Sequence, residues 1–178
     1  VEDKILIWRF RRGSREALGQ IYCEYEAMLL TMAAAILGDL ASAEDVVHDA
    51  FLDLAQAPDK VGLNGSLRHF LAVCVANRAK DRLRARRDTV SVEQIEFQEP
   101  EGQQPEVMAS RQEELRRIWS GLTQLPDEQR EVVVLHLVAG LRFHQIADTL
   151  AISINTAQSR YRYGIERLRS LLNGEVKE

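Results

Sequence analysis

Residues 143–160 read FHQIADTLAISINTAQSR, and this stretch decides the fold of the C-terminal half. Ile146, Leu150 and Ile152 are spaced to form a small apolar core, and Ala147 is small enough for two helices to cross closely. The spacing predicts a short helix over 143–151, a turn at 152–154 and a second helix capped by Asn155. This is the pattern of a helix-turn-helix.

The second helix of this pattern carries the side chains of a major-groove reader. Short polar groups come first and guanidinium groups follow, and the outward-facing set is Asn155, Thr156, Gln158, Ser159, Arg160, Arg162 and Tyr163. Thr, Gln and Ser near a helix start can reach base edges, while arginines pair with phosphates. The alternative is an ordinary helical hairpin with a solvated polar face. The agreement of cap, small residue, turn and basic helix favours DNA binding.

More helices are predicted on either side of this motif. A helix starting near residue 109 is expected to end at Leu125-Pro126, and the next is expected to run from Asp127 to a left-handed cap at Gly140. The N-terminal half predicts helices over 3–12, 14–37, 42–56 and 66–87, with Ser42 opening the third through a capping box. Strand signals are nearly absent, so the predicted fold class is all-α, with two small helical domains.

The charge distribution divides the chain. Residues 1–91 hold 13 acidic and 13 basic side chains, residues 92–114 hold 7 and 1, and residues 115–178 hold 7 and 9. This predicts an N-terminal domain over 1–88, an acidic linker over 89–108 and a C-terminal domain over 109–178. Phosphate neutralisation dominates nonspecific DNA affinity, so a net charge of −4 argues against a free-standing nonspecific DNA binder. A larger basic partner is expected to supply the positive surface.

The N-terminal half carries two charged stripes. Asp45, Asp49 and Asp53 recur at i, i+4 and i+8, and this stripe is either a docking surface for a basic partner or a solvated face. On the long helix, Arg78, Arg82 and Arg86 share one side, and Lys80, Arg84 and Arg87 lie nearly opposite. Either side could grip a DNA backbone. Asn77 and Asp81 form either a structural pair or a DNA contact, and Phe70 either stacks on an unpaired base or belongs to the core.

Taken together, these segments resemble the extracytoplasmic-function sigma factors, a compact class of bacterial RNA polymerase sigma factors with sigma domains two and four. Residues 43–54 (AEDVVHDAFLDL) resemble the polymerase-docking helix, residues 70–87 the promoter-melting and minus-ten helix, and residues 125–135 (LPDEQREVVVL) with the helix-turn-helix the minus-35 domain. Ala151 stands where the family commonly has a turn glycine, so a Cβ must fit there or the turn must shift.

The resemblance implies a role for each set of residues. The polymerase-binding set is Asp45, His48, Asp49, Leu52 and Asp53; the minus-ten set is Phe70, Asn77, Arg78, Lys80, Asp81, Arg82 and Arg84; the minus-35 set is Asn155, Thr156, Gln158, Ser159, Arg160 and Arg162. The implied partners are the two largest subunits of core RNA polymerase, promoter DNA and an anti-sigma factor. The alternatives are a sigma-like mimic that sequesters an anti-sigma factor, and a helix-turn-helix activator of the response-regulator type.

The composition and the spacing of cysteines, histidines and apolar residues argue against several other classes of protein. Two cysteines are too few for a disulfide framework, and neither a signal peptide nor an apolar run of membrane-spanning length is present, so we expect a cytoplasmic protein without membrane insertion. The four histidines lack companions at metal-ligand spacing, and no phosphate loop or nucleophile elbow occurs. We therefore expect no enzymatic activity, no metal, no cofactor and no small-molecule substrate.

Overall fold

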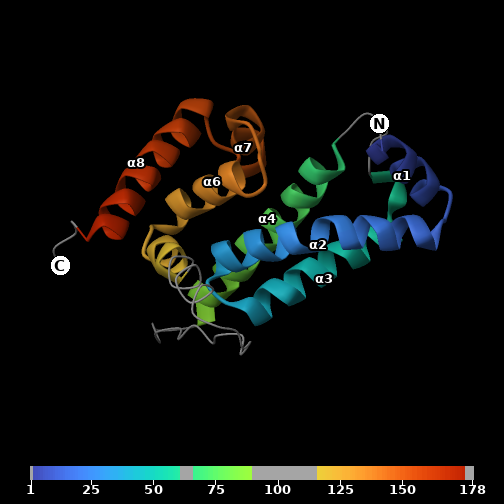
Figure 1. The fold of residues 1–178 in the computed structure, drawn as a ribbon, viewed down its shortest axis with the longest axis horizontal. Helices are drawn as coiled ribbons and strands as arrows, with labels where there is room; N and C mark the ends of the chain where they lie inside the picture. Colours follow the sequence, from blue (N-terminus) through green and yellow to red (C-terminus); the bar gives the residue numbers. More distant parts are fainter. Residues whose placement is uncertain (1, 61–65, 90–115, 175–178) are drawn as a thin grey trace, which may run out of the picture.

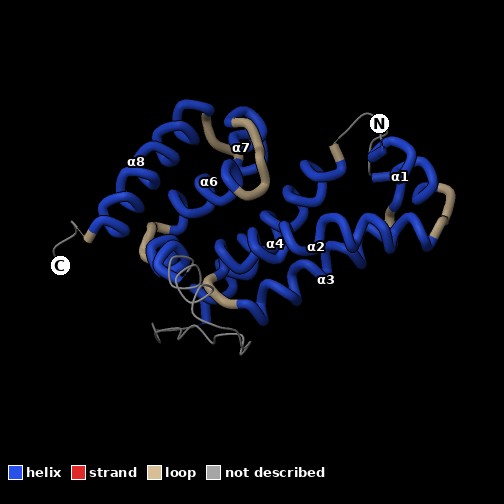
Figure 2. Tube along the Cα trace, in the orientation of Figure 1, coloured by secondary structure: helices blue, strands red, loops and turns tan. Residues whose placement is uncertain are grey.

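A computed structural model describes residues 2–60, 66–89 and 116–174, and every regular element in those ranges is helical (Figures 1 and 2). The predicted all-α class is therefore confirmed. The elements are α1 (Glu2–Arg11), α2 (Arg15–Leu37), α3 (Leu40–Gln56), the 3-10 turn η1 (Pro58–Lys60), α4 (Leu67–Thr89), a helical stretch over 116–123, α6 (Asp127–Leu137), α7 (Phe143–Leu150) and α8 (Ile154–Asn173). Apart from residue 89, which ends α4, the predicted linker lies outside the described residues.

The N-terminal domain is built around α2, which packs against α1, α3 and α4. Its ends follow the prediction: the Ser14 hydroxyl accepts from the Ala17 amide at 3.2 Å, and Gly38 ends the helix at φ 79°. That angle lies in the left-handed region, where glycine has no Cβ penalty. Ile21, Leu29 and Met32 are fully buried along the length of the helix and provide much of the core.

The start of α3 differs from the prediction. The helix begins at Leu40 rather than at Ser42, because the carboxylate of Asp39 accepts the Ser42 amide at 2.6 Å and caps the first turn. Ser42 lies inside the helix and is buried. The capping-box prediction was wrong because an Asp three residues earlier satisfies the same kind of free amide.

The C-terminal domain places α8 across α6 and α7 (Figure 1). Gly164 permits the crossing with α6, since a Cβ there would lie 2.8 Å from Val133 Cγ2. Arg130 is buried on α6 and donates to the carbonyl oxygens of Thr123 and Leu125 and to Asp127. Its guanidinium therefore ties the 116–123 stretch to the start of α6.

The helix-turn-helix has its predicted core but a shifted cap. Ile146, Ala147 and Leu150 are buried, and Ile152 is half-buried. Residue 155, however, is not the cap: Ser153 accepts from the Thr156 amide at 3.0 Å, and α8 begins at Ile154. A Ser two residues earlier forms the capping bond, which places Asn155 within the first helical turn. Similarly, α6 ends at Leu137, and Gly140 adopts its positive φ two residues beyond the Val138 cap.

Ala151 is the only described non-glycine residue with a positive φ, at 54°, where it ends α7. A left-handed conformation costs an L-residue roughly 1–2 kcal/mol, and glycine avoids that cost. Glycine also loses more backbone freedom on folding, which offsets part of the gain. We expect Ala151→Gly to stabilise the C-terminal domain by about 0.5–1 kcal/mol, measured by urea denaturation. Ala147→Gly on the same short helix, at ordinary helical angles, is the control and should destabilise. A loss of stability in Ala151→Gly would show that the turn is not strained.

The two domains also contact each other, because α6 packs against α2. Arg68 at the start of α4 donates to the carbonyl oxygen of Val138 at 3.0 Å. At the alanine-rich end of α2, residues 32–37 are all buried. The second domain therefore lies on one side of that helix end.

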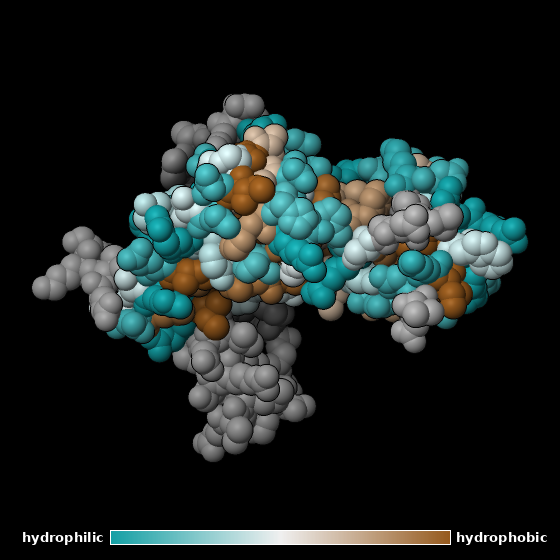
Figure 3. All heavy atoms as spheres, turned by 90° about the horizontal axis from the view of Figure 1, so that it is seen from above, coloured by the Kyte–Doolittle hydropathy of each residue, from teal (hydrophilic) through white to brown (hydrophobic). Residues whose placement is uncertain are grey.

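The surface is largely hydrophilic, with separate apolar patches on the face shown in Figure 3. The exposed large apolar side chains among the described residues include Ile5, Trp8, Leu52, Leu137 and Tyr163. Single apolar groups at a surface are ordinary. Cys23 and Cys74 are free thiols.

Candidate promoter and polymerase interfaces

The recognition helix α8 presents its predicted residues in two groups. Asn155, Gln158 and Arg162 are exposed. Thr156, Ser159 and Arg160 are half-buried because they lie nearer the side that faces α6. The first group therefore has the accessibility that a base-reading surface needs.

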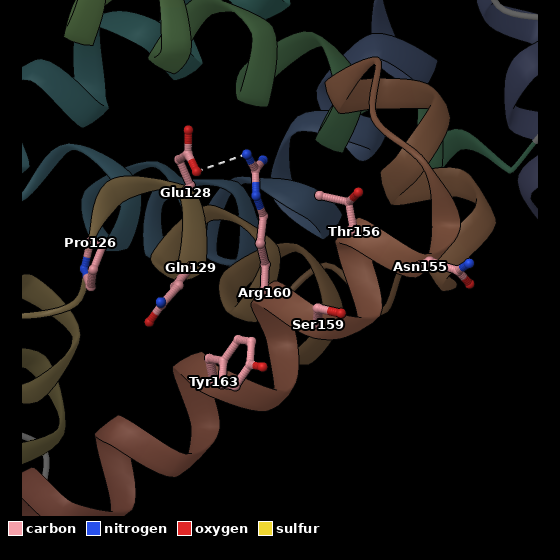
Figure 4. A pocket seen from close by; sticks show the side chains of 8 residues that line it. All are labelled: Pro126, Glu128, Gln129, Asn155, Thr156, Ser159, Arg160 and Tyr163. Carbon is pink, nitrogen blue, oxygen red and sulfur yellow. Dashed lines mark ion pairs between the residues drawn. The ribbon is translucent and has the colours of Figure 1, made fainter.

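A hollow of about 350 Å³ lies between the start of α6 and the first turns of α8 (Figure 4). Pro126, Glu128 and Gln129 line it from one side. The other side is formed by the α8 residues Asn155, Thr156, Ser159, Arg160 and Tyr163. The hollow thus joins part of the predicted minus-35 surface to a helix start that was not predicted to take part.

Arg160 points toward α6 and not toward Asn155. Its Nη2 atom lies 2.7 Å from the carboxylate of Glu128 (Figure 4). The Arg160 side chain retains 24% of its exposure, and Glu128 retains 69%. A surface ion pair of this kind contributes roughly 0–1 kcal/mol. A DNA phosphate can therefore displace Glu128 at small cost.

The two charged stripes of the N-terminal domain face each other. Arg82 on α4 pairs with Asp45 on α3 at 2.8 Å, and Arg78 pairs with Asp49 at 3.4 Å and also with Asp53. The predicted docking stripe and one of the predicted DNA-gripping stripes are therefore joined by ion pairs. These side chains remain about one-third to two-thirds exposed, so a partner can still reach them.

The last member of the arginine stripe has a structural role. Arg86 donates to Asp39, to the Ser42 hydroxyl and, at 3.2 Å, to the carbonyl oxygen of Leu37. Partial burial by itself would raise the pKa of the Asp39 carboxyl, but the bonds from Arg86 and Ser42 outweigh it and lower the pKa below its ordinary value. Arg86 thereby fixes the junction between α2 and α3.

The remaining residues that were predicted to bind polymerase stand outward. His48 is exposed and Leu52 keeps 46% of its surface in solvent, on the same helix as the aspartate stripe. A surface that combines an exposed leucine with carboxylates is suited to a partner that presents both apolar and basic groups.

The residues that were predicted to contact the minus-ten element are less uniform in exposure. Asn77, Asp81, Arg82 and Arg84 are exposed on α4, and Asp81 pairs weakly with Arg84 at 3.8 Å. Phe70 is half-buried and packs against the hydrophobic core. The core interpretation of Phe70 therefore fits this structure better than that of a ring free to stack.

Glu131 on α6 is a half-buried acid that the sequence did not single out. Burial raises the pKa of its carboxyl, while the positive charges of Lys80 and Arg160 act in the opposite direction. Its Oε1 atom is buried without a hydrogen-bond partner. A Glu one turn after Glu128 on an amphipathic helix gave no signal, because its partial burial arises from tertiary packing.

Replacing Glu131 tests that burial. The folded protein binds more protons than the unfolded chain as pH rises from the ordinary Glu pKa of about 4.3 to the raised folded value, so stability falls across that window. Above that pH window the full free-energy cost of keeping the charged carboxylate partly buried is present. We expect Glu131→Gln to have a higher Tm than the wild type at pH 7, and the difference to shrink near pH 4. Glu24→Gln, at an exposed site on α2, is the control. A constant difference at all pH values would contradict the assignment.

Among residues 2–60, 66–89 and 116–174, no three His, Cys, Asp or Glu side chains lie together as a metal ion would need. In the same ranges no helix is long and apolar enough to cross a bilayer.

Comparisons with known proteins agree with this geometry. Residues 21–89 match the family model "Sigma-70 region 2", and residues 121–170 match "Sigma-70, region 4". RNA polymerase sigma factor CarQ of Myxococcus xanthus is 29% identical, with 95% of this chain and 96% of CarQ aligned. ECF RNA polymerase sigma factor SigL of Mycobacterium tuberculosis is 32% identical, with 85% of this chain and 86% of SigL aligned.

Solved structures give the same result. CnrH, in complex with the cytosolic domain of CnrY, matches with a TM-score of 0.71 at 25% identity, over 98% of this chain and 99% of that chain. The sigma factor RpoE from Bartonella quintana, in complex with the anti-sigma factor NepR, matches with a TM-score of 0.70 at 21% identity, over 87% of this chain and 96% of RpoE, and supports the fold.

A helix-turn-helix domain combined with a region 2 domain defines a sigma-70-type transcription factor. The chain belongs to the extracytoplasmic-function family of RNA polymerase sigma factors. It is a transcription initiation factor that binds core RNA polymerase and directs it to promoters. The family consists of transcription factors that are not enzymes.

Proposed function

We propose that α8 reads the minus-35 element with Asn155, Gln158 and Arg162, supported by Thr156, Ser159 and Arg160. The observation that carries this proposal is the exposure of the side chains of Asn155, Gln158 and Arg162 on α8. Amide and guanidinium groups at that place can reach base edges and phosphates in a major groove. The chemistry of RNA synthesis is left to the polymerase.

We further propose that α4 contacts the minus-ten element and α3 docks on the polymerase. Exposed Asn77 and Arg84 and half-buried Lys80 suit contacts to a separated strand, while His48 and Leu52 extend the aspartate stripe. Because Arg78 and Arg82 are shared between the two surfaces, docking and DNA contact are expected to be coupled. We also propose a division into domains over 1–88 and 109–178 with a linker over 89–108, which is supported by two separate family matches, over residues 21–89 and 121–170.

The solved relatives in complex with CnrY and with NepR support a further partner. We propose that this factor is also held by an anti-sigma factor, and that it acts in the cytoplasm. The test is co-expression with proteins encoded beside it, followed by run-off transcription with and without the co-purified protein. A co-purified protein that leaves transcription unchanged would contradict the inhibition.

Substitutions in α8 separate base reading from phosphate contact. In the holoenzyme, Gln158→Ala should lower promoter affinity by roughly 1–3 kcal/mol and relax selectivity at one position of the minus-35 element. Arg162→Ala should weaken binding to all sequences and lower the salt slope by about 1. Filter binding across a salt series on promoter and scrambled minus-35 DNA measures both. Equal loss on both DNAs for Gln158→Ala would contradict base reading, and Glu24→Ala serves as the control.

The single experiment that tests the whole proposal is transcription from total genomic DNA by purified core enzyme with the factor added. Sequencing the transcripts should reveal start sites that share two elements. Failure to start at any site, with a core enzyme that is active with another sigma factor, would contradict it.

A further inference from the structure

The first helix carries exposed cationic and aromatic side chains that the proposed functions do not use. Lys4 and Trp8 lie on α1 and Arg12 directly follows its last residue, so the three recur at four-residue intervals along one face. All three are exposed, and half of the Trp8 surface lies in solvent. The guanidinium carbon of Arg12 lies 4.4 Å from the centroid of the Trp8 ring. These side chains, called the α1 stripe below, present an aromatic ring between two cations.

The charge around the α1 stripe is positive, although the whole chain carries a net charge of −4. Residues 4–15 hold five basic and no acidic side chains. The flanking acids are engaged in other bonds: Asp3 accepts from the Tyr25 hydroxyl at 3.0 Å, and Glu16 accepts from the Ser14 hydroxyl at 2.9 Å. A local group of cations on an acidic protein attracts a partner of high negative charge density.

The apolar side chains of α1 are divided between the core and the surface. Ile7 and Phe10 are buried, while Ile5 and Trp8 are about half exposed. A helix that binds a bilayer needs a continuous apolar face turned outward, and two apolar side chains among cations do not form one. An aromatic ring between cations is instead the combination that binds single-stranded nucleic acid, because bases stack on the ring and phosphates pair with the cations.

The dimensions of the α1 stripe suit a short single strand. Eight residues of helix rise about 12 Å, which corresponds to roughly three to four stacked nucleotides at 3.4 Å each. Half of the Trp8 surface stays exposed with Arg12 in place, so the ring can receive a base. A guanidinium over a ring can still donate to a phosphate from its edge. One short strand can therefore contact all three side chains.

The α1 stripe belongs to the end of the N-terminal domain at which α4 begins. Arg11 of α1 pairs with Asp59 of η1 at 3.0 Å, and the chain from the end of η1 to the start of α4 spans at most about 25 Å. Near the other end of α4, Arg86 bonds to the Leu37 carbonyl oxygen at the end of α2, whereas α1 lies beside the start of α2 (Figure 1). A strand held by α4 can therefore continue onto the α1 stripe.

We propose that the α1 stripe binds the separated DNA strand next to the minus-ten element, with an unpaired base stacked on Trp8 and neighbouring phosphates held by Lys4 and Arg12. This inference rests on the proposed contact of α4 with the minus-ten element. The bases of a duplex are already stacked on one another and offer the ring no free face. The contact therefore forms only after the duplex has opened, and it favours the open promoter over the closed one.

The test compares the binding of two DNAs to the holoenzyme. The first is a promoter fragment, chosen from the start sites found by genomic transcription, that is duplex through the minus-35 element and continues as a single nontemplate strand from the minus-ten element onward. The second is entirely duplex and ends before the minus-ten element. Trp8→Ala should weaken binding to the first roughly five- to a hundredfold, the range for stacking one base on an aromatic ring, and leave the second unchanged. Trp8→Phe, which keeps a ring, should recover most of the loss.

Lys4→Ala combined with Arg12→Ala tests the cations, and it decides the question if Trp8→Ala does not fold. Loss of two phosphate contacts to a single strand should lower the salt slope of binding to the first DNA by about 1.4. Leu40→Ala, at an exposed apolar side chain at the start of α3, is the matched control for Trp8. Glu24→Ala is the control for a change of surface charge. Neither control should change the preference between the two DNAs.

The outcomes separate this inference from the sigma function. If Trp8→Ala and the cation variant bind the first DNA as the wild type does, the inference is overturned and the sigma function stands. Equal loss on both DNAs, or loss of affinity for core enzyme without DNA, would also overturn it, because the α1 stripe would then serve the fold or a protein contact. If the wild-type holoenzyme itself binds the two DNAs equally, the proposed contact of α4 with the minus-ten element fails, and the inference falls with it.

Discussion

Reversing Asp45 and Asp49 to Lys together should lower the affinity for core polymerase by at least about a hundredfold. Both carboxylates are exposed on α3 beside His48 and Leu52, where the polymerase is proposed to dock. Placing like charges against a complementary surface costs several kcal/mol, and about 2.7 kcal/mol already corresponds to a hundredfold. Association measured without DNA, for example by surface plasmon resonance on immobilised core, reports this loss directly.

The ion pairs between α3 and α4 make a specific control necessary. The reversal also removes the pairs with Arg82 and Arg78 and places two lysines beside them, so part of its effect can come from a disturbed α3–α4 packing. Arg78→Ala with Arg82→Ala breaks the same pairs but keeps both carboxylates. It should retain core binding and lose roughly 0–1 kcal/mol of stability per pair. If both double variants lose core binding equally, the aspartates act through the fold and not through the polymerase.

The largest effect on stability is expected from Gly164→Leu. A Cβ at this position would lie 2.8 Å from Val133 Cγ2 and 3.3 Å from Gln129 Cβ, and the remaining atoms of leucine have no space between α6 and α8. Overpacking of this kind costs 1–3 kcal/mol or more, so we expect a loss of about 3 kcal/mol and a Tm lower by roughly 12–24 °C for the C-terminal domain.

Gly19→Leu is the matched control, because a Cβ at Gly19 on α2 would meet nothing within 4 Å. Replacing an exposed helical glycine gains up to about 1 kcal/mol from helix propensity. The two substitutions should therefore change stability in opposite directions, as measured by thermal and urea denaturation. Equal gains would show that the α6–α8 crossing can open without cost.

The helical architecture could be predicted because its signals are local. Ser14 and Gly38 mark the ends of α2 through their own backbone and side-chain chemistry, and Pro126 fixes the start of α6. Where two polar residues compete for one cap, the sequence does not choose between them. Asp39 and Ser153 form the caps that Ser42 and Asn155 were predicted to form, because the outcome depends on which oxygen reaches the free amide.

The candidate site was predictable in residue identity but not in pairing. The aspartate stripe of α3 and the arginine stripe of α4 were each visible at four-residue spacing, since that spacing is a property of one helix. Their interlocking depends on the angle and register at which two helices pack, as does the reach of Arg160 to Glu128.

The sequence by itself determined that the chain is helical, where its helices lie, that it divides into two domains and that one carries a helix-turn-helix, because caps, periodicity and charge runs act within a few residues. Only the tertiary structure decided that Arg130 is buried and Glu131 half-buried, that Gly164 is a crossing point and that α6 lies against α2. Burial arises from contacts between segments far apart in the chain, and no short stretch of sequence encodes which surfaces will meet.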